Sequence, residues 1–173
     1  MDNIDKFEAV CNKIASEQKF MPLGFRAKNL GCIRFNAANR WNGQLGQIAG
    51  FCRFDSYSNG VRALVLLLCK YVHKYNLRTI NQIIERYAPS SDGNDTRNYI
   101  RFCIENNTSY LISSKIDVFK IQLVMLVHSI IEIECGFKAA FMDDEFIHSL
   151  ESLVLHYIDF YRVSMSIYGK DEI

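Results

Sequence analysis

Several features that mark common classes of protein are missing from this chain. Its six cysteines form no CxxC pair and its four histidines show no metal-ligand spacing such as HxxxH, so we expect no metal and no other cofactor. No apolar run reaches the roughly 20 residues that cross a bilayer, so no membrane span is predicted. The opening residues, MDNIDKFEAV, lack the basic and apolar regions of a signal peptide. We therefore expect a protein that is cytoplasmic as synthesised, with reduced thiols.

The net charge is small, +1, but it is unevenly distributed along the 173 residues. Residues 1–115 carry 16 Lys and Arg against 9 Asp and Glu, whereas residues 116–173 carry 4 against 10. A basic body with an acidic C-terminal part predicts an anionic ligand, docking of one part on the other, or simply two differently charged solvated surfaces. The basic residues are scattered and no nucleic-acid-binding motif occurs, so a nucleic acid is not an expected partner.

Helical spacing of apolar residues dominates the chain. The segment VRALVLLLCKYV is apolar nearly all round and predicts a buried central helix that begins after a cap at Ser58 or Asn59. A shorter helix is expected to follow a cap at Thr79 and to end before Pro89. Further helices are expected at the N-terminus, after the Pro89 loop and over most of the C-terminal third.

The chain's one tryptophan lies in a glycine-rich segment, RWNGQLGQIAGFCRFDS, which starts at Arg40. Alternating apolar and polar residues predict short antiparallel strands over residues 31–36 and 50–55. Asn42-Gly43 and Gly46 are the expected turn residues between them. This segment therefore predicts a small, irregular β-hairpin inside a helical protein.

Two apolar helices are predicted over residues 117–134 and 144–168. Their apolar residues exceed one narrow stripe and must be covered by each other, by the core or by a second copy of the chain. These residues are Leu123, Val124, Leu126, Val127, Ile130 and Ile131 on the first helix, with Leu150, Leu153, Val154, Tyr157 and Phe160 on the second. The overall expectation is a mainly α (α+β) fold. Residues 1–115 form a domain with the hairpin at about 31–55, and residues 116–173 form a C-terminal helical hairpin packed on the same core.

Five motifs occur in the order found in a family of phage and prophage virion structural proteins. They are NLGCIRFN, WNGQLG, GFCRFDSYSNGVRAL, TINQIIERYAP and NDTRNYI. The chain resembles this family over about residues 26–106. The resemblance implies a phage or prophage origin, incorporation in a virion and contacts with other virion proteins.

A looser similarity relates the chain to glucosaminidases and lytic transglycosylases of the lysozyme superfamily. In those enzymes, motifs similar to NLGCIRF, RWNGQ and GFCRFDS surround a β-hairpin, and the helix that follows shapes a groove for glycan strands. This resemblance implies that residues 1–115 form a lysozyme-like domain that binds peptidoglycan or another glycan. Trp41 would then offer a flat face to a sugar ring. Packing of Trp41 against a neighbouring helix explains the residue equally well.

On the same resemblance, Glu17 is the candidate general acid and Asp55 the second carboxylate. Cleavage of a glycosidic bond needs a protonated carboxyl beside the leaving oxygen, with a pKa raised by apolar surroundings. Phe20, Met21 and Phe25 are near enough in the sequence to supply those surroundings. The alternatives are an exposed glutamate at a helix end and, for Asp55, a helix cap or turn residue. The segment ASEQKFMPLG also lacks the residues that usually follow the acid in the superfamily.

Polar and aromatic residues of the five motifs are candidates for contacts with a sugar. They are Asn29, Arg34, Trp41, Gln44, Tyr87, Asn94 and Tyr99. The last three belong to motifs of the phage family, and fixing the Pro89 loop is their alternative role. Arg62 begins the central helix, and we expect it in a buried ion pair with Asp55 or Asp95 because an unpaired buried arginine is costly.

The sequence therefore favours a phage- or prophage-derived protein that binds peptidoglycan glycan strands. Cleavage of the strands, as a glycoside hydrolase or a lytic transglycosylase, is left open. The alternative is a non-enzymatic virion structural or protein-interaction module on the same scaffold, with a homo-oligomer formed through the C-terminal helices. A Glu17 carboxyl in a cleft beside Trp41 would favour the enzyme, and a solvated one the scaffold.

Overall fold

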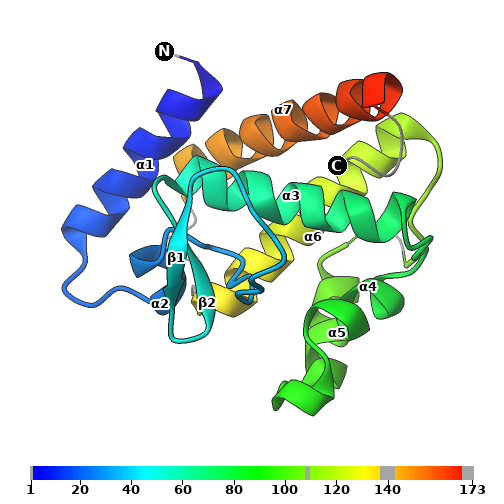
Figure 1. Ribbon diagram of the computed structural model, residues 1–173, viewed down its shortest axis with the longest axis horizontal. Helices are drawn as coiled ribbons and strands as arrows, with labels where there is room; N and C mark the ends of the chain where they lie inside the picture. Colours follow the sequence, from blue (N-terminus) through cyan, green and yellow to red (C-terminus); the bar gives the residue numbers. More distant parts are fainter. Residues whose placement is uncertain (1, 108–109, 137–142, 169–173) are drawn as a thin grey trace.

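The computed structural model describes residues 2–107, 110–136 and 143–168. These residues form seven α-helices, one 3₁₀ helix and one two-stranded antiparallel sheet (Figure 1). The expected class, mainly helical with a small β-hairpin, is confirmed. In chain order the elements are α1 (Asn3–Glu17), α2 (Leu23–Arg26), β1 (Gln44–Ile48), β2 (Phe51–Phe54), α3 (Tyr57–His73), α4 (Ile80–Tyr87), η1 (Ser90–Asp92), α5 (Thr96–Glu105), α6 (Ile116–Cys135) and α7 (Asp144–Tyr168).

Helix α3 lies at the centre of the molecule, as its nearly continuous apolar sequence predicts. Leu64, Val65, Leu68, Cys69 and Val72 are completely buried. The helix contacts α1, α6 and α7, and β2 packs against it near its first turns. Figure 1 shows the hairpin near one end of α3 and the α4–α5 pair beyond the other end.

The ends of the helices follow simple capping chemistry. Asp2 caps α1 by accepting a hydrogen bond from the Asp5 backbone N–H, and Thr79 caps α4 in a full capping box with Gln82. The predicted cap of α3 is wrong by two residues or more. Ser56 is the cap, because its hydroxyl accepts from the Asn59 N–H while Tyr57 already has helical geometry.

Helices α6 and α7 confirm the two helices predicted over residues 117–134 and 144–168. They contact each other, and α7 also lies against α1 and α3. Ten of the eleven apolar residues that needed cover are buried. Phe160 is the exception at 43% exposed.

The prediction of a buried ion pair between Arg62 and Asp55 or Asp95 is wrong. The Arg62 guanidinium instead lies over the Phe160 ring, 5.0 Å from its centroid, so the charge stays half-exposed and the ring is only partly covered.

The hairpin lies inside the predicted region. β2 confirms the strand predicted over residues 50–55, but its partner in the hairpin is β1 and not residues 31–36. β1 pairs with β2, whereas residues 31–36 contribute a single bridge between Arg34 and Phe51. Residues 33–35 still pair with the hairpin through two backbone hydrogen bonds of 2.9 Å, one from the Cys52 N–H to the Ile33 carbonyl and one from the Phe35 N–H to the Gly50 carbonyl. The buried side chain of Asn29 supports this short contact, because it accepts from the Ile33 N–H at 2.9 Å and donates to the carbonyls of Ile33 and Cys52.

The sequence predicts a turn where β1 lies, because glycines are typical turn residues. Gly46 has φ +130° at an irregular step in the strand register, and Gly43 has φ +71° just before the strand. A Cβ at Gly43 would overlap the side chains of Asp55 and Asn59, so this glycine lets the hairpin approach the start of α3.

Candidate functional site

Residues from four separate segments line one cavity of about 290 Å³, which we call the Trp41 cavity. These segments are the loop before β1, helices α3 and α4, and the Pro89 loop. The lining residues are Cys32, Ile33, Arg34, Phe35, Asn36, Asn39, Trp41, Leu67, Tyr71, Arg86, Tyr87, Pro89 and Asp92. The cavity therefore combines aromatic surface with hydrogen-bonding side chains.

Three of the seven predicted sugar contacts, Arg34, Trp41 and Tyr87, meet in this cavity. Trp41 is half-buried and packs against the hydrophobic core, so its packing role is realised as well. Its indole N–H is buried and has no hydrogen-bond partner within the described part of the chain. An unpaired buried donor costs free energy, which a hydrogen-bond acceptor would recover.

The charges of the cavity are mostly positive. The Nε of Arg34 lies 3.2 Å from Asp92 Oδ2, and the same guanidinium lies over the Phe51 ring. Arg86 stacks on Tyr75 at 4.1 Å and on Tyr71 at 5.3 Å from the ring centroids. Stacking holds the planar guanidinium in one orientation while its N–H groups remain able to donate.

Tyr87 also lines the cavity, and its hydroxyl donates to the backbone carbonyl of Gly31. Burial raises the pKa of Tyr87 well above its ordinary value, so the side chain stays a neutral donor at any physiological pH. This bond ties α4 to the loop that carries Arg34, and thereby fixes these two segments of the lining relative to each other.

Two further predicted contacts have structural roles. Asn29 is completely buried, with its hydrogen bonds used within the chain as described above. Gln44 Oε1 accepts from the backbone N–H of Trp41 at 3.3 Å and supports the turn that carries the indole. Neither residue lines the Trp41 cavity.

The two predicted catalytic carboxylates lie outside the cavity. Glu17 is exposed at the end of α1, and Phe20, expected to shield it, is itself 83% exposed. Asp55 is exposed and accepts hydrogen bonds from the Asn59 amide at 2.8 Å and the Ser56 hydroxyl at 3.0 Å. The bond from Asn59 is the main reason that the pKa of Asp55 is lowered, which is the opposite of what a proton donor at neutral pH requires.

Asn94 and Tyr99, the remaining predicted contacts, line a neighbouring cavity of about 360 Å³ together with Glu134. The Tyr99 hydroxyl donates to Glu134 Oε1 at 3.1 Å. Burial raises the pKa of Glu134, although the bond from Tyr99 and the nearby Arg34 partly offset this effect. Cys32 contacts Glu134 and also lines the Trp41 cavity, so the two cavities adjoin.

Sequence reasoning missed Arg86 and Glu134. Glu134 carried a usable signal, because an acidic residue in the last turn of an apolar helix faces the negative end of the helix dipole and needs a reason to be there. Arg86 carried none, since its importance depends on Tyr71 of α3 and on Tyr75, which follows that helix.

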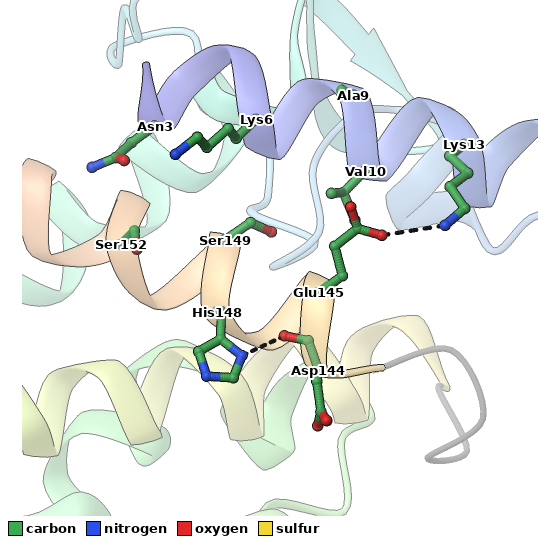
Figure 2. Close-up of a pocket in the computed structure, with 10 residues that line it drawn as sticks. All are labelled: Asn3, Lys6, Ala9, Val10, Lys13, Asp144, Glu145, His148, Ser149 and Ser152. Atoms are coloured by element: carbon green, nitrogen blue, oxygen red, sulfur yellow. Dashed lines mark hydrogen bonds and ion pairs between the residues drawn. The ribbon is translucent and has the colours of Figure 1, made fainter. Parts of the chain in front are cut away.

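A third cavity, of about 490 Å³, lies between α1 and α7 and contains none of the predicted site residues. Figure 2 shows Lys13 and Glu145 reaching toward each other across it, and their ion pair has a length of 3.2 Å. Small residues, Ala9 on α1 and Ser149 on α7, leave the space between the helices. Its charged lining is exposed, and Lys13 and Glu145 pair with each other, so this cavity is a weaker candidate for the functional site.

Among residues 2–107, 110–136 and 143–168, no three His, Cys, Asp or Glu side chains gather as metal ligands would. In the same part of the chain, each helix is too short or too polar to cross a membrane.

Comparison with known proteins gives one informative similarity. No protein-family model matches the chain. It is 36% identical over 80 residues to Protein P5 of Pseudoalteromonas phage PM2, and the match covers 45% of this chain. The chain spans about half, 49%, of the length of that relative. The similarity is thus to a phage protein, and it supports a phage origin for this chain.

Proposed function

We propose that this phage-related protein binds glycan strands of peptidoglycan through the Trp41 cavity. The observation that carries the proposal is the meeting of Arg34, Trp41 and Tyr87 in one cavity, although they come from three separate sequence motifs. An aromatic ring beside several hydrogen-bond donors suits a sugar, which has apolar faces and polar edges.

Binding without cleavage is the form of this function that the geometry supports best. Glu17 and Asp55 lie outside the cavity, and Asp92, the carboxylate that lines it, is paired with Arg34. A general acid has to reach the glycosidic oxygen and carry a proton, and neither predicted carboxylate combines these properties.

The test is sedimentation of purified peptidoglycan with the wild-type protein and two variants. Trp41→Ala should weaken binding about tenfold or more, because truncation of a central aromatic contact commonly costs at least 2 kcal/mol. Phe20→Ala is the matched control, since Phe20 is an exposed aromatic outside the cavity. Circular dichroism checks that both variants are folded. Equal binding by wild type and Trp41→Ala would refute the proposal.

A second candidate function, a virion module that self-associates through its C-terminal helices, has its own supporting observation. Leu155 and Val163 of α7 are 37% and 57% exposed, and their spacing of eight residues puts them on one face of the helix. A second copy of the chain would cover this face. Light scattering after gel filtration should then give a dimer mass for wild type and a monomer mass for the double variant Leu155→Glu, Val163→Glu.

A further inference from the structure

We propose that the Trp41 cavity selects a sugar with a free carboxylate, and that Arg86 is the residue that recognises it. This inference rests on the proposed glycan-binding function and adds the chemical class of the ligand. In peptidoglycan, the free acid is the lactyl group of a muramic acid residue that carries no stem peptide.

The first observation is the balance of donors and acceptors around the cavity. Arg34, Arg86 and the indole N–H of Trp41 are donors without acceptor capacity, and the two asparagines of the lining can donate as well. Asp92 is the single carboxylate in the lining. A ligand rich in acceptors therefore fits the cavity better than one rich in donors.

The second observation is that the two arginines differ in their pairing. Asp92 neutralises Arg34 at 3.2 Å, whereas Arg86 has no carboxylate partner within the part of the chain that the structure describes. Arg86 instead stacks on Tyr71 and Tyr75, which orient its planar group without cancelling its charge. The cavity thus keeps one positive charge, on a group that can bind a carboxylate by two parallel hydrogen bonds.

The third observation is the position of the aromatic ring relative to this charge. Trp41 and Arg86 line the same small cavity from different segments, so a sugar ring at the indole would hold its substituents near the guanidinium. An amide-linked stem peptide would remove the carboxylate charge and add bulk, and would bind less well for both reasons.

If the cavity prefers a free lactyl carboxylate, the stem peptide has to be removed from the glycan strand before the protein binds it. Hydrolysis of the amide bond between the lactyl carboxyl and the peptide adds water across that bond and releases the free carboxylate and the peptide amine. An amidase reaction of this class would therefore supply the preferred ligand, and the protein would prefer glycan strands that have already lost their peptides.

Isothermal titration calorimetry with two matched disaccharides tests the inference. One is N-acetylglucosaminyl-N-acetylmuramic acid, and the other is the same molecule with its lactyl carboxyl converted to a primary amide. We expect the acid to bind about tenfold more tightly than the amide, and the preference to shrink at 0.5 M salt, because charge-assisted bonds to an exposed arginine are screened. Arg86→Gln should abolish the preference, and Arg86→Lys should retain part of it. Arg53→Gln removes an exposed charge outside the cavity and should leave the preference unchanged.

The outcomes separate this inference from the proposed function. Equal binding of acid and amide by wild type would overturn the carboxylate preference and leave glycan binding intact. Failure of both disaccharides and of longer peptide-free strands to bind would overturn the proposed function itself. Binding of a single-stranded oligonucleotide, with loss in the Trp41→Ala and Arg86→Gln variants, would show that the acceptor-rich ligand is a nucleic acid and would refute both proposals.

Discussion

Glu8 of α1 accepts two hydrogen bonds from Ser58, one from its backbone N–H at 2.5 Å and one from its hydroxyl at 2.6 Å. Ser58 is in the first turn of α3, where backbone N–H groups lack partners within the helix. The carboxylate therefore satisfies one of these donors and also lies near the positive end of the helix dipole. This contact joins the N-terminal helix to the central one.

Replacing Glu8 by alanine should lower the free energy of unfolding by about 1.5–3 kcal/mol, the range for hydrogen bonds to a charged group in a part-buried position. Urea denaturation measures the change. Glu17→Ala is the control on the same helix, and its effect should stay within about 0.5 kcal/mol because Glu17 is exposed. A loss as large in Glu17→Ala would contradict this assignment of roles.

Gly60 in α3 gives a prediction with an unusual sign. In an open helical position, Gly→Ala stabilises a helix by about 1 kcal/mol. Here a Cβ would overlap the backbone carbonyl oxygen of Lys28, and backbone cannot move aside as a flexible side chain can. Gly60→Ala should therefore lower the melting temperature. A higher melting temperature would show that α3 does not pack so closely against the loop before the hairpin.

Ionisation of the part-buried Glu134 carboxyl should make the stability of the protein depend on pH. Burial raises the pKa of Glu134 in the folded protein, so the unfolded chain releases this proton first as the pH rises. Stability is therefore unaffected below the ordinary glutamate pKa of 4.5 and is lost as the pH rises from there toward the folded pKa. Glu134→Gln removes the ionisation but keeps an acceptor for Tyr99. Its melting temperature should match wild type at pH 4 and exceed it at pH 7; a lower value at pH 7 would refute this reasoning.

Local patterns were sufficient for the long helices but not for the hairpin. Helices α3, α6 and α7 follow from apolar spacing, and the cap of α4 follows from Thr79 and Gln82, because all these signals are contained in one segment. The strand β1 could not be predicted, since Gly43 and Gly46 look like turn residues until the tertiary contact with α3 is known. Residues 31–36 alternate like a strand, yet they pair with the hairpin through the Ile33 carbonyl and the Phe35 N–H, while the side chain of Asn29 takes the Ile33 N–H.

In the candidate site too, some residues follow from local sequence patterns and others depend on tertiary contacts. The sequence motifs single out Arg34, Trp41 and Tyr87 as candidate ligand contacts, and all three line the Trp41 cavity. The role proposed for Arg86 depends on rings from α3 and the residues just after it, which no local pattern reveals.

Asp55 has a lowered pKa through its bond from Asn59, so it is ionised at neutral pH and has no proton to donate. Glu17 is in water at the end of α1, outside the cavity that gathers the aromatic and cationic groups. We therefore expect Glu17→Gln and Asp55→Asn to sediment with peptidoglycan as wild type does. Mass spectrometry of the supernatant should detect no released muropeptides with any of the three proteins. Release of fragments by wild type, reduced at least about 100-fold in Glu17→Gln, would instead identify Glu17 as a general acid. That result would require α1 to move so that its end reaches the bound glycan.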